Sequence, residues 1–142
     1  MRPRLSKYVS LKLGGVEGEL PRLKYMLKKS FTASNFRSFW NAWNPIYSYV
    51  LMYFIYKPIR RILPRPLAVV ITFIANGLFH DLMVFLILGR SDLVITKLFL
   101  VYGLMVVIET VVGLSLTNRK TLVVVLYNLL MLLLPIIVIT LL

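Results

Sequence analysis

The stretch LAVVITFIANGLFHDLMVFLIL, residues 67–88, decides the fold of this chain, because it is an apolar run of 22 residues with one histidine near its middle. As an α-helix, this run would extend about 33 Å, and the hydrocarbon core of a bilayer is about 30 Å thick. Ionisable side chains are costly in hydrocarbon, so they usually face a cavity, a partner or a reaction path. The stretch therefore predicts a membrane-spanning helix with a functional residue at His80, the only histidine of the chain.

The composition of the whole chain supports a membrane protein. Of its 142 residues, 59% are hydrophobic, whereas soluble domains average about 45–50%. Two further apolar runs, at 93–116 and 121–142, are long enough to cross a bilayer. The sequence therefore predicts an all-α integral membrane protein with about three spanning helices, together with interfacial or re-entrant helices.

Positive charge is concentrated in the first half of the chain. The formal net charge is +12, and 13 of the 17 lysines and arginines lie within residues 1–65. We expect residues 1–33 to form a basic tail with an interfacial amphipathic helix over Leu20–Ser30. The adjoining apolar runs favour anionic lipid head groups over nucleic acid as the target of this charge. The chain has no cysteine, which excludes disulfides, thiolate catalysis and cysteine-based metal sites, and the sequence predicts no metal centre.

Residues 34–142 are predicted to form the membrane domain. Its first part, residues 34–66, contains an aromatic segment too short to span a bilayer, so we expect it to be interfacial or re-entrant. Ser34 is the expected N-cap of a short helix there, and Pro45 is expected to interrupt the chain. A basic, proline-bearing loop follows at 57–66.

The loops between the predicted spans indicate their orientation. Basic loops at 57–66 and 117–120 are expected to face the cytoplasm, which leaves the turn at 89–92 on the opposite side. The prediction is thus a multi-pass membrane protein. The sequence does not distinguish a bacterial cell membrane from the endoplasmic reticulum.

Three polar residues form a stripe on the first spanning helix. Thr72, Asn76 and His80 are spaced i, i+4 and i+8, which places them within about 80° of one another around a helix. Gly77 provides a smooth patch for the close approach of another backbone or a ligand. The residues alone are compatible with catalysis and also with interhelical hydrogen bonds, and hydrogen bonding is the expected role of Thr72. Asp81 lies about 100° round the helix from the histidine, so it does not fully share this face.

Two other polar residues lie inside the predicted spans. Glu109 is deep in the run 93–116, where a buried pair with an arginine of another helix is the expected role. Asn128 is expected to hold helices together by hydrogen bonds.

Two motifs, in order and at matching spacing, make the chain resemble the membrane-bound O-acyltransferase family. That family carries an FW-x-x-W-[NH] segment, an aromatic segment ending in Y-x-Y-x-P or a near variant, and then F-x-x-SG-x-x-H on a membrane helix. The matching residues here are Phe39, Trp40, Trp43, Asn44, Tyr53, Tyr56, Pro58, Phe73, Gly77 and His80. Asn76 takes the usual serine position. The acidic residue after the histidine is similar to that of the wax-synthase-like and sterol-acyltransferase-like branches.

The resemblance implies a reaction and roles for individual residues. Family members move an acyl group from a thioester, commonly acyl-CoA, to a hydroxyl of a lipid, sterol, sugar or protein, without a bound cofactor. His80 would be the general base that takes the hydroxyl proton. Asn44, 36 residues earlier, would stabilise the charge that develops on the carbonyl oxygen. Trp40, Trp43 and Asn76 would bind substrate, and the branch-level likeness favours a lipid alcohol as acceptor.

The matched motifs lie within residues 30–88, and full-length family members are several times longer. Several explanations are open. A second copy of the chain or a partner membrane subunit completes the reaction chamber around the acyl donor and hydroxyl acceptor, or the chain is a fragment or a degenerate copy without activity, or it is a naturally minimal version. A second reading stays open at this point. In that reading the chain is a non-catalytic membrane protein, an interaction or lipid-binding remnant of the same family, held at the membrane by its basic N-terminal region.

Overall fold

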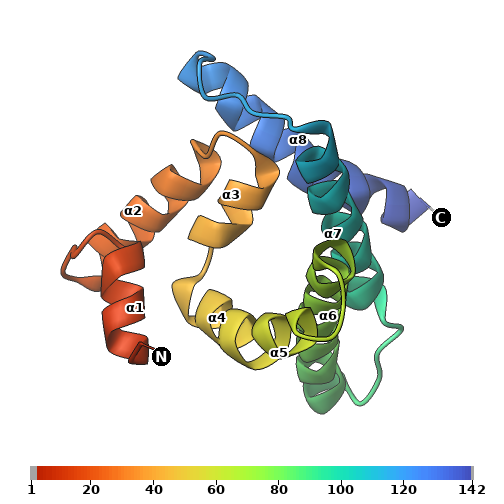
Figure 1. The fold of residues 1–142 in the computed structure, drawn as a ribbon. Coiled ribbons are helices and arrows are strands. Elements are labelled where there is room, and N and C mark those ends of the chain that lie inside the picture. The colour runs from red at the N-terminus through yellow and green to blue at the C-terminus, as the bar shows by residue number, and fades with distance from the viewer. Residues whose placement is uncertain (1–2, 142) are drawn as a thin grey trace.

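The computed structural model describes residues 3–141, which form helices joined by short loops and contain no strand (Figure 1). In chain order they are α1 (Leu5–Lys12), α2 (Glu19–Phe31), α3 (Phe36–Ala42), α4 (Pro45–Val50), η1 (Leu51–Tyr56), α5 (Lys57–Arg60), α6 (Arg65–Leu88), α7 (Val94–Val112) and α8 (Thr121–Leu141).

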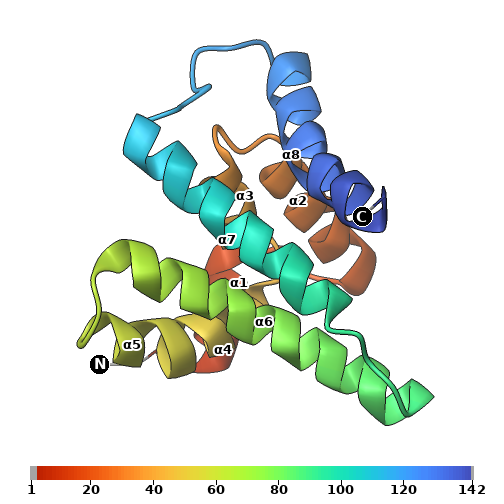
Figure 2. The ribbon, with the colours of Figure 1, turned by 90° about the vertical axis from the view of Figure 1, so that its right-hand side faces the viewer.

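Three of these helices, α6, α7 and α8, are long and apolar enough to cross a membrane. They confirm the all-α membrane fold predicted from the runs 67–88, 93–116 and 121–142. Figure 2 shows α6 and α7 running side by side in opposite directions, and α8 packs on α7. Their outward faces carry many exposed leucine, isoleucine and valine side chains, as expected of helices surrounded by lipid rather than water.

Glycines set the close contact between α6 and α7. A Cβ atom added to Gly77 would lie 2.6 Å from the Cα of Thr96, and one added to Gly103 would lie 3.0 Å from the Cβ of Phe73. Such distances leave no room for a side chain, so the two backbones can approach only because glycine stands at both crossing points. The close approach expected at Gly77 is thus a contact with a neighbouring helix.

A cluster of aromatic side chains joins α3 to α7. Phe36 and Phe39 are fully buried and pack with Phe99, Tyr102 and Val106. Aromatic rings bury large apolar areas and prefer edge-to-face or offset contacts, and both kinds occur here. The short α3, which could not be stable alone, is therefore fixed against the membrane pair.

Polar side chains fasten the ends of α2 and α3 to the long helices. Glu109 of α7 accepts hydrogen bonds from the backbone N–H groups of Phe36 (2.7 Å) and Arg37 (2.9 Å), and from the Tyr127 hydroxyl (2.6 Å). The expected pair with an arginine side chain is wrong, because the carboxylate satisfies the free N–H groups at the start of α3 instead. Asn128 donates to the carbonyls of Phe31 and Ala33, which confirms its predicted role.

The N-cap of α3 differs from the prediction by one residue. Asn35, not Ser34, caps the helix, because its Oδ1 accepts from the N–H of Ser38 at 2.8 Å. Both residue types cap well. The carbonyl of Ser34 instead accepts a bond from the N–H of Leu116.

The basic loop expected at 57–66 is shorter in the structure. Lys57–Arg60 continue the helical path from α4 through η1, a π-helical segment, and α6 already begins at Arg65. Pro66 is compatible with this because it lies in the first turn of α6, where no backbone N–H is needed. Pro58 lies in α5, which directly follows the π-helical segment. Pro45 marks the break that the sequence predicted, between α3 and α4.

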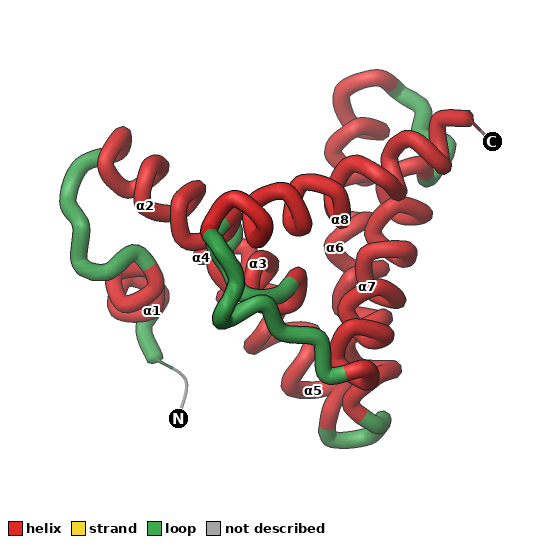
Figure 3. Tube along the Cα trace, turned by 90° about the horizontal axis from the view of Figure 1, so that it is seen from above, coloured by secondary structure: helices red, strands yellow, loops and turns green. Residues whose placement is uncertain are grey.

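The basic N-terminal region is more ordered than a loose tail. Residues 5–12 form α1, which the sequence did not predict, and this helix packs on α4. Helix α2 covers the predicted amphipathic helix over residues 20–30, and its place at a membrane interface stays a prediction. Figure 3 shows α1 and α2 on the side of the molecule away from α6 and α7.

Candidate active site

A cavity of about 170 Å³ lies where α1, α3, α4, η1, α6 and α7 meet. Four of the five site residues named from the sequence are in its lining: Trp40, Trp43, Asn44 and Asn76. The remaining lining residues are mostly aromatic or aliphatic, with Tyr8, Arg37 and Thr72 adding polar groups. The fold therefore gathers motifs that are up to 36 residues apart around one space.

Asn44 lies at the break between α3 and α4 in an unusual backbone conformation. Its φ of 40° and ψ of 81° place it in the left-handed region, which asparagine tolerates better than most residues. Its Oδ1 accepts from the N–H of Tyr47 at 3.3 Å and so caps α4. Its amide Nδ2 donates to no residue that the structure describes, and this group is available to a ligand carbonyl.

His80 has a defined tautomer when neutral. Its Nδ1 lies 2.8 Å from the backbone carbonyl of Asn76, and a carbonyl only accepts, so Nδ1 carries the proton. The lone pair is then on Nε2, the nitrogen that is able to take a proton from a substrate. The ring is stacked on Phe99, with centroids 5.2 Å apart, and packs on Tyr47 at 5.6 Å.

His80 does not line the cavity, but it contacts two residues that do, Tyr47 and Asn76. The backbone N–H of Tyr47 also donates to Oδ1 of Asn44, so Tyr47 contacts both predicted catalytic residues. Sequence reasoning missed Tyr47. Its position three residues after Asn44, on the first turn of the following helix, was the available signal.

The polar stripe on α6 is divided between two roles. Thr72 donates to the carbonyl of Ala68 at 2.6 Å, a bond within its own helix. Asn76 is 7% exposed, and its Oδ1 is buried without a partner in the described residues. The indole Nε1 of Trp40 is likewise buried without a partner there. Buried polar atoms are rarely unpaired, and these two belong to side chains on the cavity wall.

Asp81, on α6, caps the start of α7. Its carboxylate accepts from the N–H and the hydroxyl of Thr96 (2.6 and 2.5 Å), from the Ser91 hydroxyl (3.1 Å) and from the N–H of Ile95 (3.4 Å). These donors include two of the unpaired N–H groups that every helix start leaves. Asp81 thereby fixes the start of the helix whose next turn carries Phe99, the ring stacked on His80.

Helix α1 contributes one wall of the cavity and positive charge near its edge. Tyr8 lines the cavity, and burial, with a smaller effect of Tyr53, raises the pKa of its hydroxyl. Lys12 donates from Nζ to the carbonyl of Asn41 at 2.9 Å, and burial together with Lys29 lowers its pKa. Tyr8 thus keeps its proton at neutral pH and presents a neutral hydroxyl.

The described residues contain no cluster of three or more histidine, cysteine or acidic side chains that could hold a metal ion.

Comparison with known proteins gives one match. The sequence model of MBOAT, the membrane-bound O-acyltransferase family, matches residues 18–142. This match covers α2 to α8, including every residue of the candidate site except Tyr8 and Lys12 on α1. Searches of curated proteins and of solved structures found no match.

Proposed function

This chain belongs to the membrane-bound O-acyltransferase family, and we propose that it moves an acyl group from a thioester donor, such as acyl-CoA, to the hydroxyl of a lipid alcohol, with His80 as general base. Acyl transfer to oxygen is the activity of the family. The observation that supports this site is the hydrogen bond from His80 Nδ1 to the Asn76 carbonyl, because it leaves Nε2 as a base beside the cavity.

The proposed reaction needs two proton transfers. Nε2 of His80 takes the proton of the acceptor hydroxyl as its oxygen attacks the thioester carbon, and negative charge develops on the carbonyl oxygen. When the tetrahedral intermediate collapses, the C–S bond breaks and the thiolate leaves. The imidazolium returns the proton to that sulfur, so the histidine is neutral again and an ester and a free thiol are formed.

Asn44 is proposed to stabilise the developing charge. Its Oδ1 accepts a hydrogen bond from the backbone N–H of Tyr47. This bond orients the amide plane while Nδ2 stays available as a donor. A pre-oriented donor of this kind contributes about 2.7–4 kcal/mol in the transition state. Trp40, Trp43 and Asn76 are proposed to bind the substrates, since all three line the cavity.

Access to the base requires a movement of Tyr47. The ring of Tyr47 packs on the His80 ring and lines the cavity, so it stands between the acceptor and Nε2. Tyr47 is 40% exposed, which leaves its ring free to turn without disrupting a packed core. We propose that substrate binding turns this ring aside, and that a second copy or a partner membrane subunit completes the chamber around the cavity.

A test of His80 compares the wild type with His80→Ala in purified membranes supplied with a labelled acyl-CoA and a long-chain alcohol. Loss of a general base lowers rates by about 10²–10⁴-fold, so ester formation is expected to fall by at least about 100-fold at an unchanged yield of protein. The matched control is Asp92→Asn, which changes an exposed residue in the loop between α6 and α7. This variant should keep full activity.

Undiminished ester formation by His80→Ala would contradict the proposed role of this residue. Absence of ester formation by the wild type across several alcohols and acyl donors, in membranes where the protein is folded, would favour the non-catalytic alternative.

A further inference from the structure

A second, smaller hollow of about 40 Å³ lies beside the candidate active site, between α3, α6 and α7. Its lining is almost wholly apolar, and two arginine side chains border it. The residues around it are Val69, Val106, Val107, Val111, Pro66, Thr110, Arg37 and Arg65. The two arginines come from different helices, so the combination exists only in the folded chain.

The hollow lies at one end of the membrane pair. Arg65 is the first residue of α6, and Val111 is the last but one of α7. Because the two helices run in opposite directions (Figure 2), these positions are at the same end. The ends of spanning helices lie at the level of lipid head groups, so the arginines are at the depth of lipid phosphates and the valines face the start of the acyl chains.

Neither guanidinium is paired with a carboxylate of the described residues. The acidic side chain beside Arg37, Glu109, already accepts three hydrogen bonds, from two backbone N–H groups and Tyr127. Arg37 is partly buried, and a charge that is partly removed from water favours binding of a counter-ion. Guanidinium groups bind phosphate through two parallel hydrogen bonds, which an ammonium group cannot match.

From these observations we propose that the hollow binds an anionic phospholipid, with its phosphate held between Arg37 and Arg65 and one acyl chain against the four valines. Arg37, Val69 and Val106 line both this hollow and the larger cavity. The bound lipid would therefore form part of the wall of the candidate active site. The proposal does not depend on the acyl-transfer reaction.

The experiment measures lipid binding rather than activity. The full chain in detergent is titrated with dioleoylphosphatidylglycerol, and bound lipid is counted by native mass spectrometry. One lipid per chain is expected to bind tightly, and dioleoylglycerol, which has the same chains but no phosphate, is expected to bind at least tenfold more weakly. Hydrogen bonds to charged groups contribute about 1.5–3 kcal/mol, so Arg37→Gln and Arg65→Gln should each weaken binding by about tenfold or more.

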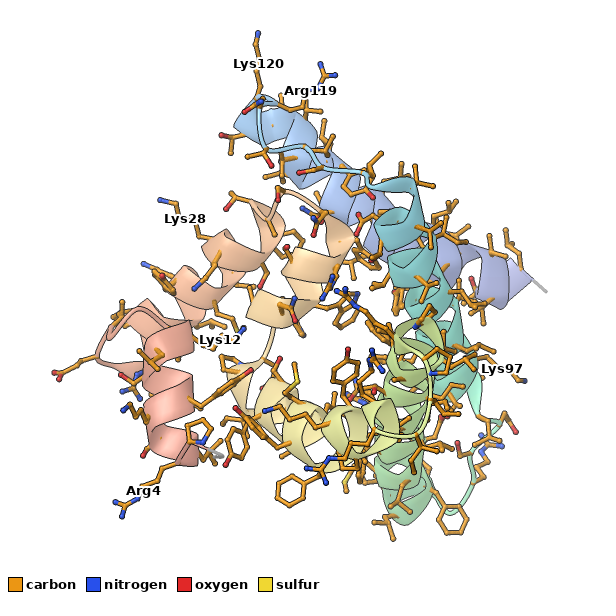
Figure 4. All side chains as sticks on the ribbon, viewed as in Figure 1. Arg4, Lys12, Lys28, Lys97, Arg119 and Lys120 are labelled. Atoms are coloured by element: carbon orange, nitrogen blue, oxygen red, sulfur yellow. The ribbon has the colours of Figure 1, made fainter. Side chains whose placement is uncertain are left out.

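Arg119→Gln is the matched control, because it removes the same charge from a residue that does not line the hollow. Arg119 projects near Lys120 at the start of α8 (Figure 4), and its loss should leave binding unchanged. Since Arg65 is exposed on the first turn of α6, Arg65→Gln keeps the test valid even if Arg37→Gln fails to fold.

Three results would overturn the proposal. Equal binding of dioleoylglycerol would show that the phosphate is not recognised. An equal loss of binding in Arg119→Gln would show general attraction to a basic protein. Competition by acyl-CoA at lower concentrations than phosphatidylglycerol would assign the two arginines to the acyl donor instead.

Discussion

Among single residues, Asn44 combines a backbone role with a proposed chemical one. The helical path breaks between α3 and α4 at this residue, whose positive φ precedes Pro45. Its side-chain oxygen caps α4, while its amide nitrogen is available at the cavity. The two roles use different atoms of one amide group, so substitutions are able to separate them.

Asn44→Asp is expected to keep the fold and lose the reaction. An aspartate still caps α4 and tolerates a positive φ, but it removes the N–H donor and adds a negative charge where charge must develop. Ester formation should fall by about 100-fold or more, while the thermal unfolding temperature stays close to that of the wild type. An aspartate variant with wild-type turnover would exclude Asn44 as the stabiliser of the oxyanion.

Among secondary-structure elements, the α6–α7 pair holds the proposed base in place. Gly77 permits the close crossing, Asp81 fixes the start of α7, and Phe99 then stacks on His80. All of these contacts lie within about two turns of the histidine. The orientation of the ring therefore depends on how one helix lies against the other.

Gly77→Ala is expected to force the two helices apart. The new Cβ would lie 2.6 Å from the Cα of Thr96, a backbone atom that a rotamer change cannot move. Overpacking of this kind typically costs about 1–3 kcal/mol, so the unfolding temperature should fall. Leu78→Ala, on the exposed face of the same helix, is the control. The explanation fails if the two variants are equally stable.

Asp81→Ala is expected to destabilise the protein by leaving the donors of Thr96, Ser91 and Ile95 unpaired. Each buried donor that loses its partner costs about 1–3 kcal/mol. Thermal unfolding in detergent measures the loss, and Asp92→Ala, which removes an exposed carboxylate nearby, should change it little. A wild-type unfolding temperature for Asp81→Ala would show that these bonds do not stabilise the start of α7.

In the whole molecule, Glu109 and Asn128 connect elements that are distant in the sequence. Glu109 joins the start of α3 to α7 and α8, and Asn128 joins α8 to the chain just after α2. These bonds hold α3, with Trp40 and Trp43 at its end, against the membrane pair. The cavity thus depends on polar contacts that cross the whole fold.

The predicted orientation of the molecule can be tested by cysteine labelling, because the natural chain has no cysteine. Single cysteines at Arg119 and at Asp92 are expected to react with a membrane-impermeant maleimide from opposite sides of sealed vesicles, with Arg119→Cys labelled from the cytoplasmic side. Figure 4 labels Arg119 in the loop before α8, and Figure 2 shows the loop between α6 and α7 at the opposite end of α7. Labelling of both from one side would contradict the positive-inside prediction.

Hydropathy and spacing were sufficient to predict the three long helices, the amphipathic α2 and the break at Pro45, because these depend on residues close together in the chain. The same local signals identified the polar stripe on α6 and the residues of two motifs. They misassigned the cap of α3 by one residue and gave Glu109 an arginine partner. Alternative caps and partners differ only in contacts between distant segments, which local patterns do not contain.

The sequence by itself determined a membrane protein of helices with a histidine inside one of them, because the cost of placing polar groups in lipid acts on each segment separately. Only the tertiary structure decided that the Tyr47 ring packs on the His80 ring, that Trp40, Asn44 and Asn76 line one cavity, and that Arg37 and Arg65 border one hollow. These relations arise where helices from different parts of the chain pack together, and packing is decided by shape and hydrogen bonding across the fold.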